Sequence, residues 1–543
     1  MCSAALALFG AAGHAQIMFD VSSKPLRDLL FLTLIGLIVF LPGLAAIPPI
    51  DRDESRYLQA TVQMIETGDV IDIRFQDQAR HKKPAGSYWA QLAGLAVTGQ
   101  IDDVKRGERA IWAQRLPSVI GALIAIWATY LCGAALVDRR EAFIGAGFLA
   151  LSASLGLEAH IAKTDAMLAG ASAVVLYGVA TRKAWPAWLG LAVGMLLKGP
   201  ILLGVAIVAL SADAVWNRSS DRIKSLLKPL PILTALLIAV PWFVAIGLQT
   251  DGAFFAEALG RDFGGKIAST QEAHGGLPGY YLLTTSFMFW PGIVAVPVAA
   301  LFAWRNRTNR DVRILLAWLV PLWIMLELVP TKLPHYTLIL YPALALLVGA
   351  AWVRVVDAGK IRTAGVWIAA IIGALLAVVA TATLWQDVST LWLILIALGL
   401  IILALFAGYC LLRGQDKTAF GLAALYLAAI FGGIIAHSSF FNFSPRLVAQ
   451  LSADMPGGAR IVSPDYREPS LVYLTETRTQ LLSDELRPGD TLVLNAETLA
   501  PDCAVARSSL SGTHYAKGRE ATVTIYKTDD CAADTLTRWA DTD

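Results

Sequence analysis

Charged residues are scarce in this chain. Lys, Arg, Asp and Glu together make up 16% of 543 residues, and the formal net charge is only +2. The mean hydropathy is +0.59, which is far above that of soluble proteins of this size. The composition therefore predicts a polytopic membrane protein. With basic and acidic residues nearly balanced, nothing indicates a nucleic-acid partner.

Nucleotide-binding motifs, internal repeats and low-complexity tracts are also missing. Residues 260–267 come close to a P-loop, but Ile267 stands where that motif requires Ser or Thr. No strand–helix context surrounds the segment either, so we interpret it as a flexible loop. A nucleotide substrate is not expected.

Long apolar runs are abundant instead. Each run is interpreted as a transmembrane helix, although the two around Lys198 are short. The thirteen runs fall near residues 27–49, 110–136, 142–157, 165–181, 185–197, 200–216, 229–248, 280–303, 313–329, 334–353, 363–383, 389–412 and 418–438. The predicted fold class is an all-α polytopic membrane protein with about thirteen spans and a small C-terminal α/β domain.

Basic residues concentrate in alternate loops, which sets the expected orientation. Examples are Arg139 with Arg140, and the cluster from Arg305 to Arg313. By the positive-inside rule these loops face the cytoplasm. The loops 50–108 and 249–279 and the tail after residue 440 then face the opposite side. We expect an uncleaved N-terminal extension over 1–26, a membrane domain over 27–440 and a soluble domain over 441–543.

The tail has its own signals. Segments 460–463, 470–474, 491–494 and 521–526 read as short strands between Pro, Gly and Asp turns. Cys503 and Cys531 lie in this tail, and an oxidising compartment would favour a disulfide between them. The alternative is two free, partly buried thiols. Cys132 and Cys410 lie in apolar runs and are expected to be inert.

The first long loop opens with the cluster Asp51-Arg-Asp-Glu-Ser-Arg-Tyr57. Apolar residues then recur at helical spacing up to Gly68, which predicts an amphipathic helix that stops there. Lys82-Lys83-Pro84 follows. Charged side chains at the end of a membrane span cost free energy, so a cluster of them indicates a functional role. Asp53 is the strongest functional candidate, although capping of the helix is the ordinary alternative.

Three lysines break the charge rule by lying on the outer side. They are Lys163, Lys198 and Lys332, each in a compact motif. Snorkelling at span ends would explain one of them, whereas three on the face of Lys83 favour phosphate binding. Asp165 begins a span on this face, either as a helix cap or as a functional acid.

Two histidines precede spans on the same face. They are His274 and His335. Each is either a solvated loop residue or a ligand of a divalent metal, for which the sequence shows no complete set.

The motifs together resemble a known family. Asp53-Glu-Ser-Arg56-Tyr57, Lys83-Pro84, Lys198-Gly-Pro200 and Lys332-Leu-Pro-His-Tyr336 are similar to motifs of the polyprenyl-phosphate-dependent GT-C glycosyltransferases. The aminoarabinose transferases of lipid A and the protein O-mannosyltransferases are the most similar branches. The resemblance implies a multi-pass enzyme of the bacterial inner membrane with a periplasmic active site.

The resemblance also implies roles for individual residues. Asp53 matches the essential first-loop aspartate, and Asp165 matches a second acid. Substrate and donor-phosphate binding is implied for Arg56, Lys83, Lys198, Lys332, His335, Tyr336 and His274. Lys82 departs from the pattern, because aminoarabinose transferases carry a metal-binding glutamate there. Ala85-Gly86 also replaces the usual Pro-Leu, which weakens an assignment to aminoarabinose itself.

The sequence therefore predicts transfer of a sugar from a polyprenyl phosphate to an envelope acceptor such as lipid A, a glycan or a protein, with inversion. The alternative is a transporter or flippase of a lipid-linked or anionic substrate. Transporters usually place their charges near the membrane midplane and often consist of two related halves. Here the charges lie in outer loops and no repeat is visible.

Overall fold

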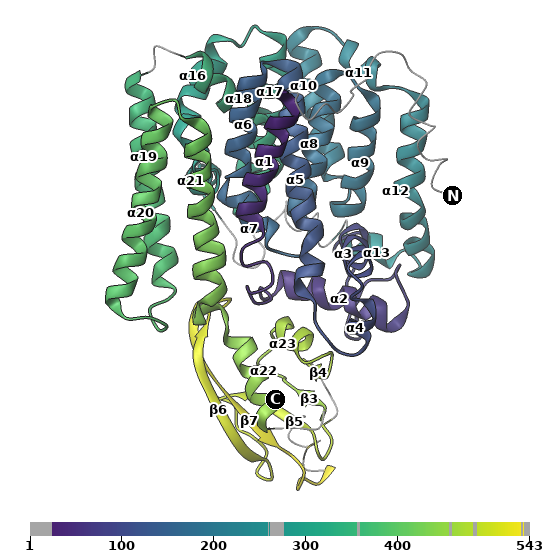
Figure 1. The fold of residues 1–543 in the computed structure, drawn as a ribbon. Coiled ribbons are helices and arrows are strands. Elements are labelled where there is room, and N and C mark those ends of the chain that lie inside the picture. Colours follow the sequence, from purple (N-terminus) through teal and green to yellow (C-terminus); the bar gives the residue numbers. More distant parts are fainter. Residues whose placement is uncertain are drawn as a thin grey trace.

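The computed structural model describes residues 24–258, 260, 276–355, 359–454, 459–481, 486–533 and 536. A bundle of long helices forms one end of the molecule and a small mixed sheet forms the other (Figure 1). Short helices of the first loop lie between the two parts. His274, residues 1–23 and most of the P-loop-like segment lie outside the described residues.

The bundle consists mainly of helices that match the apolar runs, joined by a few short helices outside those runs. In chain order they are α1 (Lys24–Phe40), α5 (Ile111–Leu136), α6 (Arg139–Ala150), α7 (Ala153–Ala159), α8 (Asp165–Thr181), α9 (Ala184–Lys198), α10 (Ile201–Asn217), α11 (Asp221–Leu226), α12 (Pro229–Gln249), α13 (Ala253–Phe255), α15 (Tyr280–Met288), η3 (Gly292–Ala295), α16 (Val296–Arg305), α17 (Arg310–Leu328), η4 (Pro334–Leu340), α18 (Tyr341–Arg354), α19 (Gly359–Ala382), α20 (Thr390–Leu412), α21 (Asp416–Ala428), η5 (Ala429–Ile434), η6 (Ile435–His437) and η7 (Ser439–Phe441). All thirteen runs thus form helical segments.

Fewer of these helices qualify as complete spans. Among the described residues, six are long and apolar enough to cross a membrane. The number rises to eight if two broken pairs each count as one span. The pair α6–α7 bends by 57° and the pair α15–α16 by 119°, so both pairs are sharply broken. Helices α8, α9 and α10 have only 15 to 17 residues each.

Small residues let the central helices approach closely. A Cβ atom on Gly121 of α5 would lie 2.5 Å from the Cα atom of Met167 in α8. A Cβ atom on Gly170 would meet the carbonyl oxygen of Gly121 at the same distance. Close backbone packing of this kind replaces the hydrophobic effect as the source of helix association in lipid.

The first loop contains α2 (Asp53–Thr67), β1 (Arg74–Phe75), β2 (Gln78–Ala79), α3 (Gly86–Val97) and α4 (Ile101–Lys105). Helix α2 ends at Gly68, whose φ of 76° is left-handed. The predicted amphipathic helix and its stop are therefore confirmed. Its polar face is not free, however, because Gln59 is buried and donates to Thr477 of the C-terminal part at 2.9 Å.

The C-terminal part contains α22 (Phe443–Asp454), β3 (Ile461–Val462), α23 (Pro469–Leu474), β4 (Thr479–Gln480), β5 (Thr491–Asn495), β6 (Val505–His514) and β7 (Arg519–Lys527). The sheet has the order β4-β3-β5-β7-β6. Strand β3 pairs in parallel with β4 and β5, while β7 pairs antiparallel with β5 and β6. Phe443 and Leu447 of α22 pack with Leu471 of α23 on one face of the sheet.

One predicted strand is wrong. Residues 470–474 form helix α23, because Pro469 suits a first helical turn and Leu471 and Val472 pack as a helix. Strands β4 and β6 were not predicted. The disulfide between Cys503 and Cys531 is confirmed. Cys132 and Cys410 are free and buried, as expected.

Candidate active site

Asp53 is the first residue of α2, and its side chain is exposed. The preceding residue, Arg52, has φ 68° and ψ −83°. A positive φ of this kind is unfavourable for a residue with a Cβ atom, and such strain often gathers at functional sites. Neither Asp51 nor Arg52 caps the helix with its side chain, so the cap interpretation of the acidic cluster finds no support.

The neighbouring Glu54 anchors the start of α2. Glu54 and Arg115 of α5 are both fully buried and form two hydrogen bonds of 2.8 and 2.9 Å. Glu54 also accepts from the backbone N–H of Ile50 and of Ala162. The guanidinium donates to the carbonyl oxygens of Leu44, Ile47 and Pro48. A satisfied buried pair of this kind fixes the backbone around Asp53.

A second charged cluster gathers at the ends of α7, α8 and α9. Lys198 donates to Asp165 Oδ1 at 2.6 Å, and Lys163 lies 3.4 Å from Asp165 Oδ2. Lys163 also lies 3.2 Å from Glu158 Oε1. His335 completes the cluster, with ring nitrogens 3.7 Å from Glu158 and 3.8 Å from Asp165. Because basic and acidic side chains alternate in this cluster, each charge is compensated by a neighbour and all of them can be buried.

This cluster acts electrostatically on Asp53. Packed surroundings alone would raise the pKa of the Asp53 carboxyl, but Lys163, Arg80 and Arg56 outweigh them and hold that pKa below its usual value. Asp53 is therefore ionised at neutral pH. In return, burial would lower the pKa of Lys163, and the carboxylates around it raise that pKa instead.

Arg80 is held in a rigid aromatic setting. Its guanidinium lies 5.1 Å from the centre of the Tyr57 ring, and its Nε donates to the Tyr88 hydroxyl at 3.1 Å. The rings of Tyr57 and Tyr88 stack on each other at 4.9 Å. These aromatic contacts fix the guanidinium near Asp53, and neither of them involves a carboxylate.

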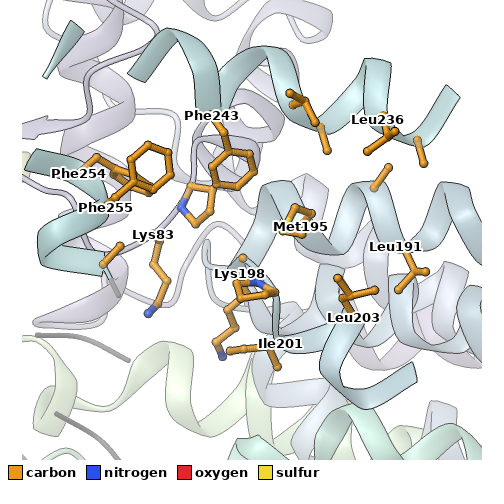
Figure 2. A pocket seen from close by; sticks show the side chains of 18 of the residues that line it. Lys83, Leu191, Met195, Lys198, Ile201, Leu203, Leu236, Phe243, Phe254 and Phe255 are labelled. Atoms are coloured by element: carbon orange, nitrogen blue, oxygen red, sulfur yellow. The ribbon is translucent and has the colours of Figure 1, made fainter. Parts of the chain in front are cut away.

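An apolar pocket of about 430 Å³ leads to two of the predicted lysines. Leu191 and Met195 of α9, Leu203 of α10 and Phe243 of α12 line it, together with Phe254 and Phe255 of α13. Figure 2 shows Lys83 and Lys198 at the same end of this pocket, both pointing away from the phenylalanines. Lys198 belongs to the charged cluster as well, so the pocket ends beside that cluster.

The C-terminal part contacts the same loop. Asp51 Oδ1 accepts from the backbone N–H of Ser470, and the backbone N–H of Asp51 donates to the Tyr515 hydroxyl. A buried hydrogen-bond chain runs from the Tyr473 hydroxyl through Gln114 and Gln91 to the carbonyl oxygen of Ala162, next to Lys163. The loop that carries Asp53 therefore lies between the helix bundle and the C-terminal part and contacts both (Figure 1).

The structure brings most of the predicted residues into one region. Tyr336 lies with its ring 5.3 Å from Lys198 Nζ, between His335 and the pocket end. Lys332 stands apart from the cluster, because its Nζ donates to the carbonyl oxygens of Leu326, Glu327 and Val329 at the end of α17. Within the described ranges, no three His, Cys, Asp or Glu residues are arranged to hold a metal ion.

Sequence reasoning missed three residues of this region. Glu158, Arg80 and Arg115 all lie within apolar or mixed segments that gave no motif. A signal was nevertheless present for two of them, because an ionisable residue inside an apolar run, such as Arg115, or directly after one, such as Glu158, indicates a functional role. Arg80 carries no such signal, because basic residues are ordinary in a loop.

Comparison with known proteins agrees with the fold and the motifs. Residues 82–245 match the family described as dolichyl-phosphate-mannose-protein mannosyltransferase. The undecaprenyl phosphate-α-4-amino-4-deoxy-L-arabinose arabinosyl transferase of Aeromonas salmonicida is 27% identical over 70% of this chain and 71% of its own length. The enzyme of that name numbered 1 in Pseudomonas fluorescens is 28% identical, over 57% of each chain.

Solved structures show the same architecture. ArnT from Cupriavidus metallidurans, bound to undecaprenyl phosphate, superposes with a TM-score of 0.74 at 17% identity. The match covers 92% of this chain and 98% of that one. An archaeal oligosaccharyltransferase from Archaeoglobus fulgidus matches with a TM-score of 0.50 over 84% of this chain and 64% of its own. In sequence and in fold this chain is therefore similar to the polyprenyl-phosphate-dependent glycosyltransferases, among them the aminoarabinose transferases and the mannosyltransferase family matched by residues 82–245.

Proposed function

We propose that this glycosyltransferase moves a sugar from a polyprenyl phosphate to a hydroxyl group of an envelope acceptor, with inversion at the anomeric carbon. The observation that carries the proposal is the apolar pocket that ends at Lys83 and Lys198 beside the charged cluster. A donor with a long hydrocarbon chain and a phosphate needs such a site, apolar along its length and cationic at one end.

The donor fits the pocket in one direction. The prenyl chain lies among the leucine, methionine and phenylalanine side chains, where burial of each CH₂ group contributes about 0.8 kcal/mol. The phosphate then lies near the ammonium groups of Lys83 and Lys198, which neutralise it as point charges. Arg56 on α2 adds a third cation on the side of Asp53.

Asp53 is the base of the proposed reaction. Its carboxylate takes the proton from the acceptor hydroxyl, and the hydroxyl oxygen attacks the anomeric carbon. The bond between this carbon and the phosphate oxygen breaks, and the phosphate leaves with the electron pair. Lys83 and Arg56 stabilise the charge that develops on the phosphate. One displacement from the opposite face inverts the anomeric carbon.

The membrane arrangement is part of the proposal. We infer thirteen spans, with the short helices α8, α9 and α10 each crossing as one of them. The site and the C-terminal domain over 441–543 lie on the periplasmic side of the inner membrane, and the membrane domain covers 27–440. The alternation of basic loops and the disulfide in the C-terminal domain support this orientation.

The first donor to test is undecaprenyl phosphate carrying 4-amino-4-deoxyarabinose, because the relatives are named for it. Lipid A is the first acceptor. Purified protein in vesicles should transfer the sugar to the acceptor and release undecaprenyl phosphate. A transporter would instead move the labelled donor between leaflets without breaking the sugar–phosphate bond, and that outcome would refute the proposal.

The same assay tests the lysine at the pocket end. Lys83→Ala should raise the KM for the donor about tenfold or more, because the phosphate loses a charged hydrogen-bond partner worth 1.5–3 kcal/mol. Lys105→Ala in the same loop is the matched control, because the Lys105 side chain is 57% exposed. An unchanged KM in Lys83→Ala would remove this lysine from donor binding.

A further inference from the structure

Glu158 is a buried carboxylate of the site for which the proposed reaction has no use. It lies near the end of α7, the short second half of the broken pair α6–α7. Only 2% of the residue is exposed. A carboxylate so deeply buried requires partners for both oxygens, since its desolvation is otherwise uncompensated.

Only one of its two oxygens is occupied. Oε1 lies 3.2 Å from Lys163 Nζ and 3.7 Å from His335 Nδ1. Oε2 is buried and accepts no hydrogen bond from any residue within the described ranges. Leaving a buried acceptor without a donor costs about 1–3 kcal/mol, so native proteins normally fill such a position with water or a ligand.

Asp165 shows the contrast within the same cluster. Its Oδ1 accepts from Lys198 at 2.6 Å, and its Oδ2 faces Lys163 at 3.4 Å and His335 at 3.8 Å. Both oxygens of Asp165 therefore have cationic or polar neighbours. Of the two carboxylates that contact Lys163, only Glu158 has an oxygen atom without a hydrogen-bond donor.

We propose that Glu158 is a substrate-binding residue of the transfer site, and that its free oxygen, Oε2, accepts a hydrogen bond from the sugar of the donor lipid. The inference rests on the proposed function and adds the part of the donor that this residue recognises. The donor offers two polar groups. A phosphate diester anion carries no hydrogen-bond donor and is repelled by a carboxylate, whereas a sugar ring presents hydroxyl or amino groups that donate.

The cluster then divides the donor between two kinds of side chain. Lysines at the pocket end bind the phosphate, and the carboxylate of Glu158 binds the sugar. Lys163 connects the two functions, because it holds Glu158 Oε1 and also acts on Asp53. The sugar is thereby held beside the base that activates the acceptor.

The competing explanation is that Glu158 serves only as a counter-ion that holds Lys163. A pair of lipids separates the two roles. One is undecaprenyl phosphate carrying 4-amino-4-deoxyarabinose, and the other is undecaprenyl phosphate without a sugar. Dissociation constants for both are measured with the full-length protein in detergent micelles, wild type and variants side by side.

Glu158→Gln should weaken binding of the sugar-bearing lipid about ten- to a hundredfold and change binding of bare undecaprenyl phosphate less than twofold. Lys163 retains the amide oxygen, so the amide NH₂ group replaces Oε2 and cannot accept a hydrogen bond. Glu158→Asp keeps the charge for Lys163 but withdraws the second oxygen, and should give the same selective loss. The matched control is Asp213→Asn, which alters another buried pair, with Arg222, at 3.1 Å.

Equal losses for the two lipids, or no loss for either, would overturn the role of Glu158. Failure of the proposed function has a different signature, since the wild-type protein would then transfer no sugar at all. Selective weakening by both Glu158 variants, with Asp213→Asn unchanged, is the result that supports the assignment.

Discussion

Asp53 and Glu54 are adjacent in sequence and have opposite surroundings. Asp53 is exposed and influenced by three cations, whereas Glu54 is fully buried and bonded to Arg115. The strained backbone of Arg52 turns the chain so that the first carboxylate faces the site while the second faces the bundle. At this scale the two adjacent acids divide into one candidate base and one anchor.

Replacement of Asp53 by Asn should abolish transfer while leaving donor binding largely intact. The amide has nearly the same shape and cannot take a proton, so a loss of about a hundred- to ten-thousandfold in kcat is expected. The low pKa of Asp53 means that the wild-type rate does not fall through loss of the base between pH 5 and pH 8. Initial rates and the donor KM measure both effects.

The control for this variant is Asp102→Asn in the same loop, because the Asp102 side chain is 79% exposed. It should retain full activity. An active Asp53→Asn enzyme would exclude Asp53 as the base and leave Asp165 as the remaining candidate.

Arg115→Met should destabilise the protein strongly. The change leaves the Glu54 carboxylate buried without its cation and three carbonyl oxygens without a donor. Breaking a buried pair in this way typically costs about 3–5 kcal/mol. Thermal unfolding in detergent should show a clear fall in Tm.

Arg106→Met removes a surface pair with Asp103 and should change stability by less than about 1 kcal/mol. Similar Tm values for both variants would contradict the anchoring role.

At the scale of elements, the decisive contact is that of the C-terminal domain with the loop before α2. Asp51 accepts from Ser470 at the start of α23 and lies near Ser444 of α22. Other titratable groups in this junction are Glu468, Tyr466, His514 and Tyr515, from the strands and connections around α23. Burial, and then the charge of Glu468, raise the pKa of Asp51 to about 6.

This raised pKa predicts how the junction responds to pH. The folded state holds a proton on Asp51 more tightly than the unfolded chain, whose aspartates titrate near 3.9. Stability is therefore unaffected below pH 4, decreases as pH rises through the window from 4 to 6, and stays lower above it by up to about 3 kcal/mol. Asp51→Asn removes the titration and should be more stable than wild type at pH 7.5.

Thermal unfolding between pH 5 and pH 8 checks this expectation. The wild-type Tm should fall with rising pH relative to that of Asp51→Asn. Asp529→Asn, at a side chain that is 50% exposed, should follow the wild-type curve. Parallel curves for wild type and Asp51→Asn would show that Asp51 does not titrate in this range.

Sequence patterns located elements better than contacts between them. Apolar periodicity identified the bundle helices and α2, and Gly68 marked the end of α2 correctly. The pattern could not reveal that Gln59 meets Thr477, because the two residues are 418 positions apart. Residues 470–474 were misread because a short apolar run fits strand and helix equally well, and its packing against α22 decides between them.

The same limit applies to the site. Asp53, Asp165, Lys198 and His335 were singled out from motifs, and the structure brings both Lys198 and His335 within 4 Å of Asp165. Lys332 had the same appearance in sequence but caps the end of α17. Only the tertiary arrangement distinguishes a lysine that binds carbonyl oxygens from one that meets a carboxylate.

For the whole molecule, orientation in the membrane decides whether all these residues share one compartment. The first-loop helices α2, α3 and α4 lie at the end of the bundle nearest the C-terminal domain (Figure 1), and Asp51, just before α2, contacts that domain directly. The basic cluster from Arg305 to Arg313 spans the end of α16, the connection after it and the first turn of α17. The positive-inside rule then places this connection in the cytoplasm and the C-terminal domain in the periplasm.

Reporter fusions test this orientation directly. A phosphatase reporter joined after Ala453 should be active, because it folds only in the periplasm, whereas the same reporter joined after Arg310 should be inactive. A reporter that fluoresces only in the cytoplasm should give the reverse pattern at both positions. The number of crossings between the two points must then be odd, as it is in the proposed arrangement of thirteen spans. If both fusion points reported the same side, that arrangement would fail, and the periplasmic placement of Asp53 and Lys83 would fail with it.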